Sequence, residues 1–168
     1  MTSSATAAAS QTELAAAMRS TLGRFCTGIT IVTATSEYGP SGFACQSFSA
    51  LSLDPPMVLL CPAKSSTSWP RIAMATRFTI NVLGADHEQL CRDFAVSGAD
   101  KFAGRAWPSS PLTGAPVVPD ALAVIDCSLE TEHDAGDHTV VLARVLGLRH
   151  TDGDPLLFFG GQYRQLAG

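Results

Sequence analysis

Residues Gly39–Pro62 read GPSGFACQSFSALSLDPPMVLLCP, and the rest of the chain is arranged around them. Two apolar stretches within them, Gly42–Ala50 and Met57–Cys61, predict strands. The segment Leu51–Pro56 predicts the connection, because its two successive prolines cannot continue a hydrogen-bonded ladder. Alternate side chains of a strand face opposite ways, so one face of Gly42–Ala50 carries hydroxyls among apolar groups and the other carries an amide. This pattern favours the wall of a site for a flat ligand with polar edges.

The composition limits the classes of protein to which the chain could belong. Its 168 residues suit one domain, and we expect a well-buried core because 46% of them are hydrophobic. Only 15% are charged, which suggests that a second subunit covers part of the apolar surface. The net charge of −4, without a basic run, argues against binding to nucleic acid or to an anionic membrane. Five cysteines without a CxxC pair, and no signal peptide or membrane span, predict reduced thiols and a cytoplasmic location.

The remaining segments alternate between apolar patterns and turn residues. Residues 1–9 are predicted to form a disordered tail, and residues 10–168 a single domain. The predicted helices cover Ser10–Phe25 with a capping box of Ser10 and Glu13, a short segment from Trp69, and His87–Ser97 capped by Asp86. The predicted strands outside the central stretch are Gly28–Thr35, Arg77–Leu83, Leu122–Thr131, Thr139–Leu148 and Pro155–Phe159. Turns or loops are expected at Ser36–Gly42, Gly98–Val118 and His133–His138.

These elements indicate the fold class. Six or seven strands against two or three helices, without alternation of strand and helix, predict a mainly β protein. An antiparallel barrel with peripheral helices fits this count best.

The run Lys64–Ser68, KSSTS, is the strongest chemical pattern. Four hydroxyls and one ammonium group at a junction between strand and helix offer donors to a phosphate. An ordinary helix cap explains the same residues equally well. Gln46, Ser47 and Asn81 are polar residues in otherwise apolar strands, so each is expected to hydrogen-bond to the protein or to a ligand.

The segment His133–His138, HDAGDH, contains two His and two Asp residues. A hairpin sends these side chains apart and no further ligand motif accompanies them, so we predict no metal site. A single functional histidine at the start of a strand and solvated turn residues remain as alternatives. The chain lacks the GxGxxG, GxxxxGK[ST] and GxSxG motifs, which argues against a Rossmann domain, a P-loop and a hydrolase elbow. The residue patterns therefore predict a small barrel for a flat, phosphate-bearing ligand.

Several segments together resemble the short-chain flavin reductases, the reductase components of two-component flavin-dependent monooxygenases. These segments are CTGITIVTA, GFACQSFSALSLDPPMVLLCP, RFTINVL, DKFAG, GDHTVVLARV and LLFFGGQY. The likeness is greatest to reductases that serve aromatic or steroid-ring hydroxylases, through FCTGIT and GFACQSF. It runs from Arg19 to Tyr163. The resemblance implies a split β-barrel and a homodimer with flavin sites near the subunit interface.

The resemblance also implies roles for individual residues. Ser65, Ser66 and Thr67 are expected to hold the flavin phosphate, while Gln46 and Ser47 meet the ring or the ribityl chain. With the polar Asn81, the expected flavin-binding residues are Pro40, Ser41, Gly42, Phe43, Ala44, Gln46, Ser47, Cys61, Pro62, Ala63, Lys64, Ser65, Ser66, Thr67 and Asn81. The expected NAD(P)H-binding residues are His138, which is the catalytic candidate, and Phe159, Gly160, Gly161, Gln162 and Tyr163, with Lys101–Phe102 nearby.

The function implied is an NAD(P)H:flavin oxidoreductase that delivers reduced FMN or FAD to a separate monooxygenase. Such a protein holds NADH against the flavin and needs no Rossmann loop, because the two cofactors carry the chemistry. Two alternatives on a similar barrel stay open: a flavoprotein oxidase of the pyridoxamine-phosphate-oxidase type, and a non-enzymatic protein that binds flavin or a product of haem. The residues do not distinguish FMN from FAD, or NADH from NADPH, or a tightly bound flavin from a diffusing one.

Overall fold

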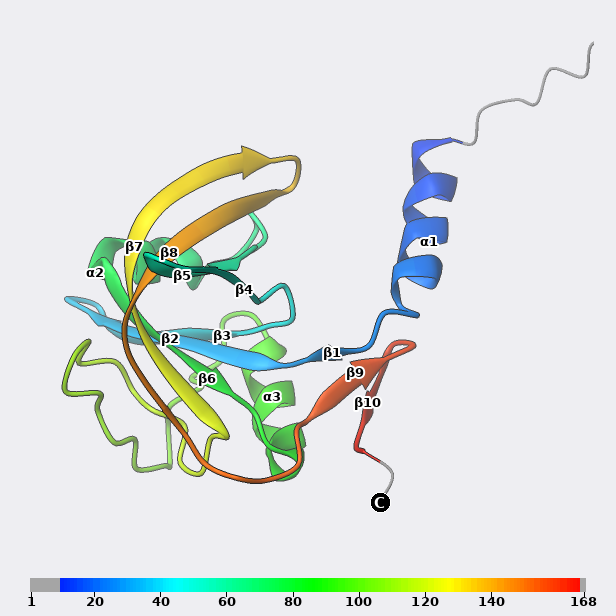
Figure 1. The fold of residues 1–168 in the computed structure, drawn as a ribbon. Coiled ribbons are helices and arrows are strands. Elements are labelled where there is room, and N and C mark those ends of the chain that lie inside the picture. Colours follow the sequence, from blue (N-terminus) through cyan, green and yellow to red (C-terminus); the bar gives the residue numbers. More distant parts are fainter. Residues whose placement is uncertain (1–9, 167–168) are drawn as a thin grey trace, which may run out of the picture.

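The computed structural model of the protein describes residues 10–166. The predicted disordered tail, residues 1–9, lies outside the described residues, so the division into tail and domain stays a prediction. Figure 1 shows strands that curve around one core, with α1 standing apart from them. The helices are α1 (Gln11–Leu22), α2 (Trp69–Ala75) and α3 (Glu88–Ala95), with a 3-10 turn at Ala85–His87. The strands are β1 (Thr27–Gly28), β2 (Thr30–Ser36), β3 (Gly39–Cys45), β4 (Ser49–Leu53), β5 (Pro56–Leu60), β6 (Arg77–Val82), β7 (Ala123–Ala135), β8 (His138–His150), β9 (Leu157–Phe159) and β10 (Gln162–Arg164).

The strands form two antiparallel sheets. The larger has the order β3-β2-β6-β7-β8-β5-β4, and the smaller has the order β1-β9-β10. Register shifts interrupt the β7–β8 pairing at Asp126/Cys127 and at Leu129/Thr131. Such bulges bend a hairpin, and the bent β7–β8 pair joins β6 on one side to β5 on the other. The mainly β barrel predicted from the sequence is confirmed.

The central stretch departs from prediction at its middle. The predicted strand Gly42–Ala50 is wrong as a single element, because β3 ends at Cys45 and β4 begins at Ser49. The predicted connection Leu51–Pro56 is too long, since Leu53 already pairs with Pro56. Proline is tolerated there because it is the first residue of its strand.

Other turns are also tighter than predicted, because the strands pair up to the last residue. Ser36 pairs with Gly39 in place of the wider turn Ser36–Gly42. Ala135 pairs with His138, which leaves only Gly136 and Asp137 in the β7–β8 turn. Gly136 has φ +64°, the left-handed backbone that such two-residue turns require.

Two further predictions needed correction. Gly28–Thr35 is not one strand, because β1 pairs with β9 while β2 pairs with β3 and β6. The prediction that Asp86 caps the helix α3 is wrong, because Asp86 lies inside the 3-10 turn that precedes this helix. The strand β10 was not predicted. It follows β9 through Gly160 and Gly161, whose φ angles of +61° and +77° suit a two-residue hairpin.

The helix α1 begins as predicted but packs differently from a core helix. The Ser10 side chain accepts from Glu13 N, and the Glu13 side chain accepts from Ser10 N, which completes the capping box. No residue of α1 is buried, and Leu14, Met18 and Leu22 are 55%, 51% and 60% exposed. The helix therefore presents an uncovered apolar stripe.

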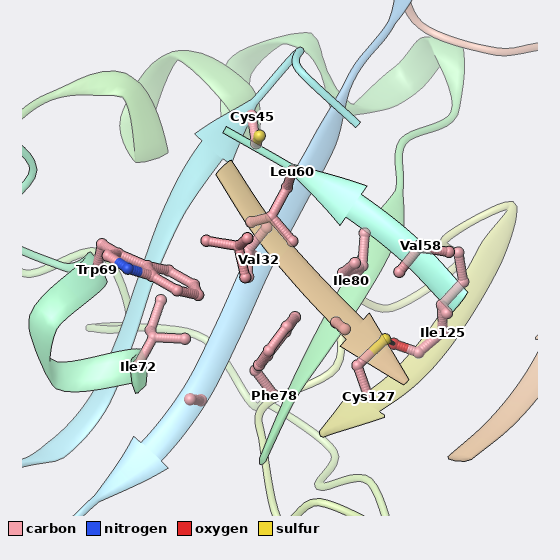
Figure 2. Close-up of a cluster of buried hydrophobic side chains, with 13 residues drawn as sticks. Val32, Cys45, Val58, Leu60, Trp69, Ile72, Phe78, Ile80, Ile125 and Cys127 are labelled. Atoms are coloured by element: carbon pink, nitrogen blue, oxygen red, sulfur yellow. Dashed lines mark hydrogen bonds between the residues drawn. The ribbon is translucent and has the colours of Figure 1, made fainter. Parts of the chain in front are cut away.

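The barrel core is built from side chains of six strands and one helix (Figure 2). On β2, Val32 belongs to this core, while Ile31 points the other way into a second cluster beneath α3. Trp69 of α2 covers one end of the core, with its ring edge-on to Phe78 at 5.9 Å between centroids. Its Nε1 donates to Glu132 Oε1 at 2.7 Å, which satisfies the indole donor. The core thus fixes the start of α2, where the KSSTS run ends.

Candidate functional site

A cavity of about 540 Å³ lies between the end of β3, the segment after β5, α3 and the β9–β10 hairpin. Among the residues predicted for the site, those in its wall are Phe43, Ala44, Gln46, Ser47, Cys61, Pro62, Ala63, Ser65, Ser66, Thr67, His138 and Tyr163. The central stretch and the KSSTS run therefore meet in one place. We call this space the first cavity.

Hydroxyl groups of the KSSTS run form one end of the first cavity. Ser66 also caps α2, because its Oγ accepts from Trp69 N at 3.1 Å. Ser65 and Thr67 make no side-chain hydrogen bond to any residue between 10 and 166 that the structure describes. The helix-cap alternative thus holds for Ser66, while phosphate binding by Ser65 and Thr67 stays a prediction.

The Ser47 hydroxyl is fully used by the protein. It donates to Cys61 O at 2.9 Å, accepts from Cys61 N at 3.0 Å and lies 3.3 Å from Cys45 Sγ. A hydroxyl has one donor and two acceptor positions, so these contacts leave none for a ligand. Ser47 therefore joins the end of β3 to the end of β5. Burial raises the pKa of the Cys45 thiol beside it.

Asn81 does not belong to the site. Its side chain on β6 is fully buried and donates to Ile31 O at 3.0 Å, while its Oδ1 accepts from Val118 N at 3.0 Å. These contacts hold the long loop after α3 against β6. Asn81 therefore hydrogen-bonds to the protein and not to a ligand, which is the first of the two possibilities that the sequence left open.

His138 lies at the mouth of the first cavity, where β8 begins. Its backbone forms a bridge with Ala63, and Thr139 N donates to Pro62 O at 3.0 Å. The ring Nδ1 lies 2.7 Å from Asp137 Oδ1, and this contact lowers the pKa of the Asp137 carboxyl. When Nδ1 donates to Asp137, Nε2 of a neutral ring is the free acceptor.

Lys64 lies outside the cavity wall, contrary to the prediction. Its Nζ pairs with Asp134 Oδ1 at 2.9 Å on the β7–β8 hairpin. Both side chains are exposed, so this ion pair adds little to stability. The KSSTS run therefore contributes only neutral hydroxyls to the wall of the first cavity.

The β9–β10 hairpin turns different residues toward the cavity from those predicted. Phe158 and Tyr163 are cross-strand partners, and both line the cavity. Phe159 and Gln162 form the next pair, so strand alternation turns their side chains to the opposite face. Phe159, Gly160, Gly161 and Gln162 do not line the first cavity, and their contact with NAD(P)H stays a prediction.

Tyr163 is held in place by α3. The Arg92 guanidinium lies 4.5 Å from the ring centroid, and the phenol oxygen lies 3.4 Å from Cys91 Sγ. Phe158 packs edge-on against the Tyr163 ring, with 5.3 Å between centroids. Burial raises the pKa of Tyr163 to about 12, so the phenol stays neutral near pH 7.

Lys101 also lines the first cavity. Its Nζ donates to Gly42 O at 3.1 Å and to Phe94 O at 2.9 Å, and burial lowers the pKa of this amine. Gly42 suits this packing because a Cβ there would lie 2.8 Å from a Phe94 ring carbon. Pro40, Ser41 and Gly42 line a second cavity next to the first, and not the first cavity itself.

Comparison with known proteins places this fold and cavity in a family. The family model described as "Flavin reductase like domain" matches residues 22–167. The chain belongs to this family. Flavin-dependent monooxygenase reductase subunit HsaB of Rhodococcus jostii is 51% identical over 146 residues, covering 86% of this chain and 74% of that protein. The NADH-dependent FMN reductase SmoA of Agrobacterium fabrum is 46% identical over 145 residues, covering 86% and 82%.

Solved structures agree with this membership of the flavin reductase-like family. Nitrilotriacetate monooxygenase component B from Mycobacterium thermoresistibile has a TM-score of 0.89 and 44% identity, covering 94% of this chain and 89% of that one. The NADH:FAD oxidoreductase SgcE6 of Streptomyces globisporus, in complex with NAD and FAD fragments, has a TM-score of 0.88 and 31% identity over 96% and 98%. The split barrel and the family that the sequence resemblance predicted are confirmed.

The first cavity of this flavin reductase-like chain fits a flavin. Its volume lies in the range of about 300–1,000 Å³ that small-molecule sites occupy. Its wall offers the hydroxyls of Ser65 and Thr67, which suit a phosphate, and the aromatic side chains of Phe158 and Tyr163, which suit flat rings. Gln46 adds an amide to the same wall.

Several lining residues could not be found from sequence patterns. Ile29 lies between β1 and β2, Cys91 and Phe94 lie on α3, Phe158 lies on β9, and none of the four is a polar residue that stands out from an apolar strand. Between residues 10 and 166, no group of three or more His, Cys, Asp or Glu side chains could hold a metal ion. Within the same residues, every helix is too short or too polar to cross a bilayer.

Proposed function

We propose that this flavin reductase uses NADH to reduce a free flavin and supplies the reduced flavin to a partner flavin-dependent monooxygenase. The observation that carries the proposal is the first cavity, which has a hydroxyl end, aromatic walls and His138 at its mouth. The names of the relatives support it, since the HsaB proteins, at 51% and 47% identity, are reductase subunits of flavin-dependent monooxygenases. The residues assigned to the flavin are part of this proposal.

Each part of the cavity has a separate task. Ser65 and Thr67 donate to the flavin phosphate, while the backbone of Gln46 and Ser47 borders the ring. Hydride transfer between nicotinamide and flavin is the chemistry that the two bound groups supply. The protein contributes position, because a near-attack geometry removes much of the entropic part of the barrier.

His138 orients the hydride donor. Its backbone is fixed by Ala63 and its Nδ1 by Asp137, so Nε2 faces a ligand in one direction. Phe158 and Tyr163 close the other side, and the Arg92 contact keeps the Tyr163 ring from swinging away. We place NADH ahead of NADPH because SmoA and a Streptomyces relative are named as reductases that use NADH.

We further propose a homodimer in the cytoplasm. The apolar stripe of α1 and the exposed Leu53 and Leu148, at 95% and 72%, are surfaces that a second copy covers. The cysteines are all free thiols, which supports a reducing compartment. Light scattering at micromolar concentration is expected to give twice the chain mass of 17.6 kDa. A mass equal to that of one chain contradicts the dimer.

Steady-state oxidation of NADH with added free FMN or FAD tests the activity. Turnover that rises with flavin concentration and saturates supports the proposal, because the flavin is then a substrate. Oxidation without added flavin indicates a resident cofactor of the oxidase type, and binding without oxidation indicates a flavin carrier. Hydroxylation by a purified monooxygenase, with NADH and this protein as the only reductant, tests the partner.

A further inference from the structure

Three of the five cysteines line the first cavity, and the proposed hydride transfer uses none of them. They are Cys45, Cys61 and Cys91, and each is a free thiol. Cys45 is the last residue of β3, and Cys61 directly follows β5. Two of the three thiols therefore belong to the corner where the chain leaves both strands. In proteins of a reducing compartment, cysteines that do form disulfides are usually catalytic or redox-sensing.

Ser47 holds Cys45 and Cys61 together. Its Oγ lies 3.3 Å from Cys45 Sγ, while it donates to Cys61 O at 2.9 Å and accepts from Cys61 N at 3.0 Å. Burial raises the pKa of the Cys45 thiol, hydrogen bonds with Ser47 and with the Cys61 backbone lower it, and the Cys61 thiol raises it again. The Cys45 thiol thus lies near both the backbone and the thiol of Cys61. Cys91 is engaged elsewhere, because its Sγ lies 3.4 Å from the phenol oxygen of Tyr163.

The two thiols of this corner differ in their access to the cavity. Cys45 is 5% exposed, whereas Cys61 is half-buried in the cavity wall. A small oxidant in the cavity therefore meets Cys61 first. The raised pKa leaves little thiolate on Cys45, and thiolate is the form that reacts, so Cys45 is protected from direct oxidation. Its nearness to Cys61 compensates in a second step, because neighbouring groups react at a high effective concentration.

The proposed function supplies an oxidant in the same cavity, and the inference rests on that function at this point. When no monooxygenase takes up the reduced flavin, O2 oxidises it. One reduced flavin and one O2 then give one oxidised flavin and one hydrogen peroxide, which carries the two electrons of the hydride. Peroxide that forms at the flavin site reaches Cys61 before it is diluted into the solution.

We propose that Cys61 and Cys45 form a disulfide in response to this peroxide, which inhibits the reductase when reduced flavin is not consumed. The Cys61 thiolate attacks one peroxide oxygen, the O–O bond breaks and the leaving hydroxide takes up the thiol proton, which gives a sulfenic acid and water. The Cys45 sulfur then attacks the Cys61 sulfur, and a second water leaves as the S–S bond forms. The two thiols lose two electrons and the peroxide gains them. An external thiol reverses the reaction by exchange.

The disulfide changes the cavity wall beside the proposed flavin ring. The new bond draws the Cys61 side chain toward β3, and the contact between Ser47 and Cys45 Sγ is lost. The segment that leads from Cys61 into Pro62 shifts with it. Because this corner borders the proposed flavin site, the affinity for flavin falls.

Peroxide treatment of the full chain without flavin or NADH tests the pair. Intact mass and peptide mapping are expected to show the loss of two hydrogens and a Cys45–Cys61 linkage. Calorimetry is expected to show an affinity for FMN about ten-fold lower, and dithiothreitol reverses both changes. Cys61→Ser and Cys45→Ala are each compared with their own untreated protein, and neither is expected to lose affinity on treatment. Cys26→Ser, which removes an exposed thiol outside the cavity wall, is expected to respond as wild type does.

Turnover with NADH and FMN in air, without a monooxygenase, tests the source of the oxidant. The wild-type rate is expected to decline with time, and catalase or the Cys61→Ser substitution is expected to prevent the decline. A linkage mapped to other cysteines, a peroxide response that persists in Cys61→Ser, or an FMN affinity that the disulfide leaves unchanged overturns the inference. Absence of NADH oxidation in wild type contradicts the proposed function alone, because the linkage and its effect on FMN binding are measured without turnover.

Discussion

Replacing Ser47 by Ala tests whether its hydroxyl supports the cavity wall or contacts the ligand. The Ser47 hydroxyl makes two hydrogen bonds to the backbone of Cys61 and a third contact to Cys45 Sγ. These contacts bridge the point where the chain leaves β3 and the point where it leaves β5. The variant keeps the backbone and removes only the bridge.

The magnitude follows from the bonds that are lost. A typical hydrogen bond contributes about 0.5–1.5 kcal/mol to the free energy of unfolding, so two give roughly 1–3 kcal/mol. Ser47 lies at the surface, and water can take over part of the bonding of the Cys61 backbone, so we expect about 1–1.5 kcal/mol. For a chain of this length that corresponds to a fall of about 2–6 °C in the melting temperature.

Thermal and urea denaturation of the protein without flavin provide the measurement, with Ser49→Ala as the matched control. The Ser49 hydroxyl bonds only to the adjacent Ala50 O, so its loss is expected to change stability by less than about 0.5 kcal/mol. Flavin affinity of Ser47→Ala is expected to fall with stability, because the Cys61–Pro62 wall loosens. If Ser47→Ala leaves stability unchanged but greatly weakens flavin binding, this reasoning is refuted, and the Ser47 hydroxyl contacts the ligand instead.

Three further predictions follow from the site. His138→Ala is expected to lower kcat/KM for NADH by about ten- to hundred-fold, with flavin affinity nearly unchanged, and stopped-flow reduction with wild-type rates contradicts it. Ser65→Ala combined with Thr67→Val, which leaves the Ser66 cap intact, is expected to weaken FMN binding by roughly 1–3 kcal/mol in calorimetry, and unchanged affinity contradicts the phosphate assignment. The pKa of Tyr163 is raised to about 12 in the folded chain, so its contribution to stability is complete below the ordinary pKa near 10 and declines as pH rises toward about 12. Tyr163→Phe is expected to reduce that slope in urea titrations between pH 9 and about 11, and an identical slope contradicts the assignment.

The sequence predicted most of the strands but not where they stop. Strand alternation and turn residues located β6, β7 and β8, while the break after Cys45 has no glycine or proline to mark it. Residues 46–48 contain no turn residue that would end the strand, and tertiary contacts of Ser47 with Cys61 accompany the break. Local patterns cannot report a hydrogen bond between residues so far apart in the chain.

The predicted site shows the same limit. The KSSTS run and the GFACQS segment were found because their polar residues stand out from apolar surroundings. Phe158 was missed in favour of Phe159 because only the register with Tyr163 decides which of two adjacent aromatic residues faces inward. Asn81 was assigned to the flavin because an isolated amide in a strand gives the same signal whether its partner is a ligand or Val118 N.

The proposed phosphate donors, Ser65 and Thr67, agree with a flavin that is released after its reduction. Hydrogen bonds from a cation to phosphate are roughly twice as strong as neutral ones, and Lys64, the cation of the KSSTS run, is paired with Asp134 outside the first cavity. Ser65 and Thr67 are neutral donors, and Lys101, which also lines the first cavity, uses two of its three N–H groups on backbone carbonyls. A phosphate held by Ser65 and Thr67 is fixed in direction mainly by hydroxyls, with at most one N–H group of Lys101 as a charged donor. That balance suits a protein whose proposed task is to orient the flavin for one hydride transfer and then to release it.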